Sequence, residues 1–259
     1  AVPERPRALC IFEHVYFARP DSVVEGDSIH SLRVKMGEKL AEEAPADADL
    51  VIGVPDSGLP GAEGFSRASG IPFGTGLVKN RYVGRTFIQP TQDMREMGVR
   101  LKLNPLKEAI EGKRLVVVDD SIVRGTTSKQ LVRMLREAGA AEVHMRIVSP
   151  EVKWPCFYGI DTDAQRQLIS ANKDVAGVCE WIDADSLGFL SLPGLLSCVR
   201  PGGYCCACFD GSYPVAIPAA LSRDNFLDGY APNNLRPSSA TSHRLVREIA
   251  LEIEKEYQE

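Results

Sequence analysis

The stretch LVVVDDSIVRGTT, residues 115–127, decides the fold that this sequence predicts. Its first four residues are apolar, which is too short a run for a helix but typical of a buried parallel strand. Asp119 and Asp120 follow where that strand leaves the sheet. Ser121 begins a short polar turn in which Gly125 can adopt backbone angles that other residues avoid, and an amphipathic run over 129–138 then predicts a helix. The order strand, loop, helix indicates an α/β fold.

The loop after this strand is suited to a sugar phosphate. Backbone N–H groups at a helix start, together with the hydroxyls of Thr126, Thr127 and Ser128, favour a phosphate monoester, and the paired acids could hold ribose hydroxyls or Mg²⁺. The alternative is that the two acids only cap a helix, as in many open sheets. The density of acids, glycine and hydroxyls in so few residues favours ligand binding over helix capping. Neither a G-x-x-x-x-G-K-[ST] nor a G-x-G-x-x-G phosphate motif is present.

A second stretch repeats this order. Residues 50–54 predict another buried strand, followed by the turn 55–58 and a helix of small residues that reaches about Ser69. The carboxyl ends of parallel strands face one crevice, so Ser57 is expected to converge with Asp119 and Asp120. An ordinary strand-to-helix turn remains the alternative. Residues 143–148 predict a third strand of the same sheet.

The segment between 71 and 103 has a different character, because it is basic and lacks an apolar period. One interpretation is a solvated hairpin whose charges decorate the surface. The other is a lid that closes on pyrophosphate and neutralises it, which its position between two phosphate-edge strands favours. Its basic residues are Lys79, Arg81, Arg85, Arg95, Arg100 and Lys102.

Composition narrows the class of protein. Hydrophobic residues make up 44% and charged residues 25% of the 259, as in ordinary globular proteins, and no apolar run is long enough for a membrane span. A net charge of −5 gives no general basis for binding nucleic acid, so an anion site must be local. Seven cysteines argue against a disulfide framework and favour a cytoplasmic enzyme with thiols as metal or cluster ligands; Cys179 and Cys198, in apolar surroundings, fit the core.

Five motifs together resemble those of the glutamine phosphoribosylpyrophosphate amidotransferases over roughly residues 10–217. They are VPDSG, KNRYVGRTFIQP, VVVDDSIVRGTT, PCFYGID and C-x-x-C-F. The resemblance implies a type I phosphoribosyltransferase fold, a parallel sheet flanked by helices with a C-terminal cysteine-rich segment and tail. It also implies that phosphoribosylamine is made from phosphoribosyl pyrophosphate (PRPP) and glutamine-derived ammonia, the first step of de novo purine synthesis.

The resemblance also assigns roles to residues of this chain. Mg²⁺ and PRPP are expected at Ser57, Asp119 and Asp120. The substrate-binding loop is expected to comprise Asp119, Asp120, Ser121, Arg124, Gly125, Thr126 and Thr127, and the catalytic basic residues are expected to be Lys79, Arg81, Arg85 and Lys102.

A [4Fe–4S] cluster is a further implication of the resemblance, which places its ligands at Cys10, Cys156, Cys205 and Cys208. Four thiolates, two of them in a C-x-x-C pair, are what a cubane cluster needs. Zinc is the main alternative. Cys206 stands where the family has an aliphatic residue, so Cys205 and Cys206 could exchange roles.

The expected organisation has four parts: an N-terminal segment over 1–28, a phosphoribosyltransferase domain over 29–200, a cluster-binding segment over 201–217, and a linker with a final helix over 218–259. The family's glutaminase domain and its nucleophile are not visible in the sequence, so ammonia would come from a separate domain or subunit or from solution. Purine nucleotide inhibitors and a homo-oligomer are expected. The competing functions are nucleobase salvage by a related phosphoribosyltransferase and non-catalytic sensing of PRPP or nucleotides.

Overall fold

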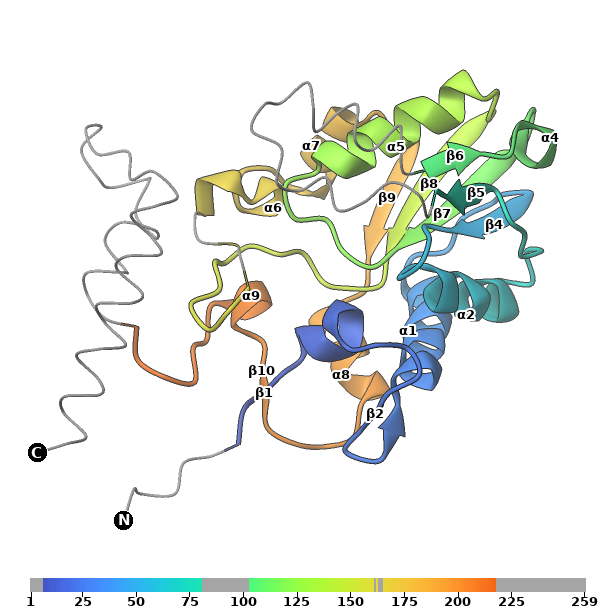
Figure 1. Cartoon of the computed structure of the whole chain (residues 1–259). Helices are drawn as coiled ribbons and strands as arrows, with labels where there is room; N and C mark the ends of the chain where they lie inside the picture. The colour runs from blue at the N-terminus through green and yellow to red at the C-terminus, as the bar shows by residue number, and fades with distance from the viewer. Residues whose placement is uncertain (1–6, 81–102, 161, 163–164, 218–259) are drawn as a thin grey trace, which may run out of the picture. The chain divides into compact units, whose positions relative to one another are not determined.

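A parallel sheet forms the centre of the computed structural model, which describes residues 7–80, 103–160, 162 and 165–217 (Figure 1). The sheet has the strand order β4-β7-β8-β9 and every neighbouring pair is parallel. Its strands are β4 (Leu50–Gly53), β7 (Arg114–Asp119), β8 (Glu142–Ile147) and β9 (Ser186–Phe189). The α/β fold with a parallel sheet flanked by helices is confirmed, and the organising stretch supplies the inner strand β7.

The centre of strand β7, residues 115–118, is apolar because both faces of the sheet are covered there. Val116 and Val118 belong to a hydrophobic core on one face of the sheet, while Leu115 and Val117 belong to a second core on the other face. All four side chains are fully buried. Alternation of side chains along a strand, combined with helices on both faces, explains the uninterrupted apolar run.

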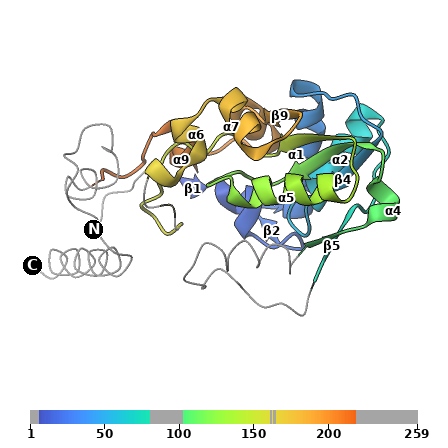
Figure 2. The ribbon, with the colours of Figure 1, turned by 90° about the horizontal axis from the view of Figure 1, so that it is seen from above.

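Helices cover the two faces as separate layers (Figures 1 and 2). On one face lie α1 (Ile29–Glu43), α2 (Leu59–Ser69) and α8 (Leu192–Cys198), and on the other lie α5 (Thr126–Glu137) and α7 (Val175–Ile182). Helices α1 and α2 approach closely through glycines: a Cβ on Gly37 or Gly64 would collide with backbone of the opposite helix. The small-residue helix that the sequence predicts up to about Ser69 is confirmed as α2.

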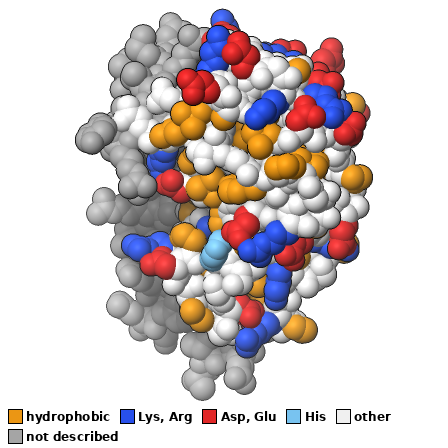
Figure 3. All heavy atoms as spheres, turned by 90° about the vertical axis from the view of Figure 1, so that its right-hand side faces the viewer, with side chains coloured by type: hydrophobic (Ala, Val, Ile, Leu, Met, Phe, Trp, Pro, Cys, Tyr) orange, Lys and Arg blue, Asp and Glu red, His pale blue; other side chains and the backbone are white. Residues whose placement is uncertain are grey.

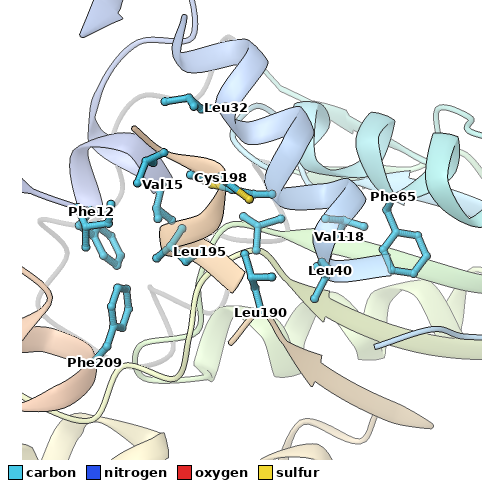
Figure 4. Close-up of a cluster of buried hydrophobic side chains, with 14 of the residues drawn as sticks. Phe12, Val15, Leu32, Leu40, Phe65, Val118, Leu190, Leu195, Cys198 and Phe209 are labelled. Atoms are coloured by element: carbon cyan, nitrogen blue, oxygen red, sulfur yellow. The ribbon is translucent and has the colours of Figure 1, made fainter. Parts of the chain in front are cut away.

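The larger core extends from the sheet to both ends of the described chain (Figure 4). Phe65 and Leu40 pack near the sheet, whereas Phe12 and Phe209 contact each other with ring centroids 6.1 Å apart. Apolar burial of this kind contributes roughly 25 cal/mol per Å². The N-terminal segment and the cysteine-rich segment are therefore part of the same packed unit as the sheet.

The N-terminal segment is built from short elements. It contains β1 (Leu9–Cys10), a π-helical turn η1 (Glu13–Phe17) and a small hairpin of β2 (Val23–Val24) and β3 (Asp27–Ser28). The backbone N–H of Ala18 donates to the carbonyl of Glu13 at 3.0 Å, which closes the π turn. The turn buries His14 and Val15 against the core, so tertiary packing overrides the extended preference of the aromatic run.

The helical elements after β8 are short. The first two are η3 (Gln165–Gln167) and α6 (Ile169–Asn172). Helix α7 was not predicted, because its short sequence is too apolar for a helical period; Asp174 caps it by accepting a hydrogen bond from Gly177 N at 2.8 Å. The remaining short elements are β5 (Leu77–Lys79), β6 (Leu103–Pro105), α4 (Lys107–Ile110), β10 (Tyr204–Cys205) and α9 (Ala207–Asp210).

The surface in Figure 3 mixes apolar side chains with charges of both signs, and no broad basic area is visible on that face. Within the described parts of the chain, every helix is too short or too polar to cross a lipid bilayer. Most of the basic segment and the expected C-terminal linker and helix lie outside the described residues. The four-part division of the chain stays a prediction.

Candidate functional site

Asp119 and Asp120 lie side by side at the carboxyl end of β7, and each is only 8% exposed. Asp120 N donates to Asp119 Oδ1 at 2.9 Å. Burial raises the pKa of both carboxyl groups, and the neighbouring Asp120 raises the pKa of Asp119 further. A pair of buried carboxyl groups at a strand end can accept hydrogen bonds from ligand hydroxyls or bind a cation.

Asp120 is the more strongly stabilised anion of the pair. Ser57 Oγ and Ser121 Oγ each donate to its carboxylate at 2.5 Å. These hydrogen bonds, and then the charge of Arg33, oppose the increase in pKa that burial causes. Asp120 therefore favours the charged form more than Asp119 does. Its carboxylate oxygens accept hydrogen bonds from hydroxyls on two different loops.

Ser57 reaches Asp120 because its loop folds back onto the end of β7. Val54 N donates to Val118 O at 2.9 Å, and Gly58 N donates to Val54 O at the same distance. A Cβ on Gly58 would collide with Val118 O, so only glycine permits this approach. The loops after β4 and β7 thus meet at one edge of the sheet, as expected for parallel strands.

The phosphate loop, residues 121–127, continues directly into α5. Gly125 is the N-cap with φ of 75°, and Lys129 N donates to Gly125 O at 2.9 Å. The helix begins at Thr126, earlier than its amphipathic pattern predicts, so Thr126 and Thr127 form its first turn. Unpaired N–H groups of a helical first turn point toward an incoming anion.

The basic residues expected at the site are only partly described. Lys79, at the end of β5, forms an ion pair of 2.5 Å between its Nζ and Asp56 Oδ2, one residue before Ser57. Arg124 Nε, within the phosphate loop, donates to Gln167 Oε1 at 2.9 Å. Arg81, Arg85 and Lys102 lie outside the described residues, so their roles stay predictions.

The four cysteines expected as cluster ligands line one cavity of about 320 Å³. Parallel pairing of β1 with β10 places Cys10 directly opposite Cys205. Cys156 joins them from a turn in which Tyr158 N donates to its Sγ at 3.4 Å, and Cys208 comes from α9. The cavity is large enough for an inorganic cluster, and its thiol donor set suits iron and sulfide.

Burial raises the pKa of Cys208, and the nearby Cys10 and Cys156 thiols raise it further. Cys10 and Cys156 therefore lie close enough to Cys208 to affect its pKa. Cys206 lies instead in the larger hydrophobic core, where burial raises its pKa to about 11. Among the described residues, no group of three or more acidic, histidine or cysteine side chains is close enough together to hold a single metal ion.

Comparisons with known proteins agree with this geometry. The family model named phosphoribosyl transferase domain matches residues 27–149, which include β4, β7 and the acid pair. Residues 27–149 form a phosphoribosyltransferase domain. The type I fold expected from the sequence is therefore confirmed.

Three relatives from different organisms share a name and a high sequence identity with this chain. Proteins named amidophosphoribosyltransferase are 60% identical over 223 residues in Synechocystis sp., 58% over 216 in Mycobacterium tuberculosis and 52% over 222 in Methanothermobacter thermautotrophicus. These matches cover 85%, 81% and 85% of this chain, and 45%, 41% and 47% of the relatives. The chain spans about half the length of these relatives. The resemblance expected from the five motifs is confirmed.

Two solved structures share the fold at high identity. One is titled as the allosteric regulatory enzyme of purine biosynthesis, with a TM-score of 0.77 and 49% identity. The other is the glutamine PRPP amidotransferase of Bacillus subtilis complexed with ADP and GMP, with a TM-score of 0.76 and 50% identity. Each match covers 85% of this chain and 49% of the solved chain.

Sequence reasoning overlooked several residues around the phosphoribosyltransferase site. Asp56 stands in the predicted turn, and its acidic side chain beside Ser57 was the available signal. Arg33 lies in α1, where its charge gave no distinctive signal, and it is 2% exposed. It donates to His14 O and Ala18 O at 2.9 and 2.8 Å, and its charge lowers the pKa of Asp120. Trp181 was missed because α7 was not predicted.

Proposed function

We propose that this chain carries out the phosphoribosyl transfer of an amidophosphoribosyltransferase. The reaction joins ammonia to the ribose C1 of PRPP and releases pyrophosphate, giving 5-phosphoribosylamine, the first step of purine biosynthesis. The observation that carries the proposal is the hydrogen-bonded group of Asp120, Ser57 and Ser121 at the start of the phosphate loop. The name shared by relatives up to 60% identical supports ammonia over a nucleobase as acceptor.

In this proposal each part of the site has one task. The phosphate loop and the first turn of α5 bind the 5-phosphate, and the carboxylates of Asp119 and Asp120 accept hydrogen bonds from the ribose hydroxyls. Lys79, with Arg81, Arg85 and Lys102, neutralises the pyrophosphate. The bond from C1 to the pyrophosphate oxygen breaks and its electron pair leaves with pyrophosphate. The nitrogen lone pair of ammonia forms the new C1–N bond, and a proton passes to solvent.

Magnesium fits the same edge, since Asp119 and Asp120 offer the carboxylate oxygens it prefers and Ser57 adds a hydroxyl. When bound, it would supply positive charge to the pyrophosphate oxygens. Asp119, Asp120 and Ser57 would hold the ion, and Lys79 would add a further positive charge for the pyrophosphate.

The cavity of Cys10, Cys156, Cys205 and Cys208 is proposed to hold a [4Fe–4S] cluster. The volume of the cavity and the four thiols that line it support this ligand set over one that uses Cys206, whose side chain lies in the apolar core. The cluster would fasten the paired strands β1 and β10 to the turn around Cys156. We assign it no electron transfer, since forming a C–N bond from PRPP and ammonia changes no oxidation state.

The wider setting of the enzyme is also proposed. Purine nucleotides are expected to inhibit it at a phosphate site, because the similar Bacillus subtilis enzyme was solved with ADP and GMP. A glutaminase domain or subunit is expected to deliver ammonia from glutamine, as the resemblance implies. We expect a homo-oligomer in the cytoplasm, where thiol ligands stay reduced.

The test is the choice of acceptor. The anaerobically purified chain with Mg²⁺ and PRPP should release pyrophosphate when ammonium salts are added, faster as the pH approaches the ammonium pKa, because only NH₃ carries a free lone pair. Adenine, guanine and uracil should give no nucleotide, and glutamine alone should give no product. Nucleotide formation from a base would indicate salvage, and PRPP binding without turnover by any acceptor would indicate a sensor.

A further inference from the structure

The phosphate loop is supported from behind by the segment 165–182, which comprises η3, α6 and α7. Ile169 N donates to Val123 O at 2.9 Å, and Gln167 Oε1 accepts from Arg124 Nε. Helix α7 also packs directly on α5 (Figures 1 and 2). The loop is thus held between the sheet edge on one side and this rear segment on the other.

Trp181 of α7 makes the closest contact with the loop's glycine. A Cβ built on Gly125 would lie 2.7 Å from Cζ3 of the Trp181 ring and 2.9 Å from Cδ1 of Ile169. The indole edge therefore lies against the buried Gly125 backbone with no room for a side chain between them. Gly125 has φ of 75°, a conformation that one bulky neighbour helps to fix.

The Trp181 ring also contacts the charged side chain of Lys129, near the start of α5. Lys129 Nζ lies 4.7 Å from the centroid of the Trp181 ring, a cation–π distance, and its backbone N–H bonds to Gly125 O. The ring therefore contacts both ends of the first turn of α5. The orientation of the N–H groups in that turn depends on where these two residues sit.

We propose that Trp181 is a positioning residue for phosphate binding: its indole ring holds Gly125 and the first turn of α5 in the conformation that receives the 5-phosphate of the substrate. The inference rests on the proposed function, since it takes residues 121–127 as the phosphate loop. Trp181 itself touches no substrate. Its removal loosens the loop, so ligand binding suffers before chemistry, because a bound substrate restores the same geometry.

Trp181 also provides its own spectroscopic signal. The sequence has two tryptophans, and the other, Trp154, lies against Gly211 next to the cysteine-rich segment. In a Trp154→Phe background all indole emission comes from Trp181. Ribose 5-phosphate, which carries the phosphate without the leaving group, should then change the intensity or wavelength of that emission.

The experiment compares Trp181→Ala, Trp181→Phe and a matched control, Val178→Ala, in the full chain. Val178 is a fully buried residue of α7 that belongs to the core beneath α5, so its truncation destabilises the helix without removing the contact to Gly125. Calorimetry with ribose 5-phosphate gives affinity, ammonia-dependent turnover of PRPP gives KM and kcat, and thermal unfolding gives stability.

The Trp181→Ala variant should bind ribose 5-phosphate about tenfold more weakly and raise the KM for PRPP by a similar factor, with kcat changed by less than about threefold. Trp181→Phe should recover most of the affinity, and Val178→Ala should keep it despite lower thermal stability. Wild-type affinity in Trp181→Ala, or an equal loss in Val178→Ala, would overturn the inference while leaving the proposed function intact.

The two proposals fail in different ways. Wild-type protein that binds ribose 5-phosphate but transfers nothing to ammonia would contradict the proposed function, and the calorimetric comparison of variants would still decide the role of Trp181. Wild-type protein that binds no ribose 5-phosphate would refute both the phosphate-loop assignment and the positioning role.

Discussion

The phosphate edge and the cysteine cavity are built in opposite ways. Most of the phosphate edge comes from one continuous stretch after β7, whereas the cavity gathers thiols from both ends of the described chain and from the turn at Cys156. One loop conformation positions most of the first site, and Ser57 joins it from the loop after β4. The second exists only when β1, β10 and α9 have assembled. Substitutions should therefore act locally and on function at the phosphate edge, but on ligand retention and assembly at the cavity.

The strongest test of this contrast is Cys208→Ser. Wild-type protein purified without oxygen should contain about four iron and four sulfide per chain, and the variant should lose all of them, because a hydroxyl is a poor cluster ligand. Iron and sulfide analysis with visible absorption measures the effect. Serine at Cys10, Cys156 or Cys205 should act in the same way.

Cys179→Ser is the matched control, since Cys179 Sγ donates to Ala184 O at 3.2 Å on α7, outside the cavity lining. It should retain full iron. A colourless wild-type protein with one zinc per chain, or a Cys208→Ser variant with unchanged iron, would contradict the cluster assignment.

A smaller but still large effect is expected at the acid pair. Asp119→Asn and Asp120→Asn should each reduce kcat/KM for PRPP by about 100-fold, since each removes a charge that accepts hydrogen bonds or binds the ion, while the fold persists. Steady-state pyrophosphate release measures kcat/KM, and circular dichroism shows whether the fold persists. Asp47→Asn, on an exposed acid paired with Arg114, should leave turnover unchanged. Normal PRPP affinity and a normal turnover rate in both variants would contradict the assignment of Asp119 and Asp120 to the PRPP site.

Gly125→Ala separates backbone strain from collision with Trp181. Both Gly125 and Gly70 have positive φ, 75° and 74°, so alanine at either position should cost about 1 kcal/mol of stability. Only Gly125 faces a ring, whereas nothing lies within 4 Å of a Cβ on Gly70. We expect Gly125→Ala to raise the KM for PRPP about tenfold and Gly70→Ala to leave it unchanged. Equal KM values in the two variants would show that the contact is unimportant.

The smallest expected effect concerns Asp56, whose carboxylate forms an ion pair with Lys79. Asp56→Asn should lower the KM for PRPP by about twofold, because an exposed ion pair is weak and its loss frees Lys79 for pyrophosphate. Asp21→Asn, in a similarly exposed pair with Arg19, serves as the control. A higher KM in Asp56→Asn would mean that Asp56 helps to bind the substrate or its ion.

The contrast between the two regions also explains what the sequence could predict. The strand 115–118, its two acids and the following loop were visible because they are adjacent and each residue type has a local physical reason. The strands before Ser57 and over 143–148 followed from the same apolar signal. The meeting of Ser57 with Asp120 needed only the rule that parallel strands end at one edge.

Residues that act through tertiary packing were not predictable in this way. The π turn over Glu13–Phe17 and the helix of Trp181 are short, and burial rather than local propensity fixes them. Arg33 looks like any charged residue of an amphipathic helix until its carbonyl partners are known. The pairing of Cys10 with Cys205 has no local signal, and only the resemblance to a known family brought those cysteines together in advance.

The pairing of β1 with β10 also has a consequence for the order of biosynthesis. These strands lie at opposite ends of the described chain, so the sheet, both helical layers and the phosphate edge are all synthesised between them. On the ribosome, Cys10 emerges long before Cys205 and Cys208 exist. Contacts so distant in sequence form after local ones, since closing a long loop costs entropy that only a nearly complete core can offset. The proposed cluster site is therefore complete only after the sheet has folded.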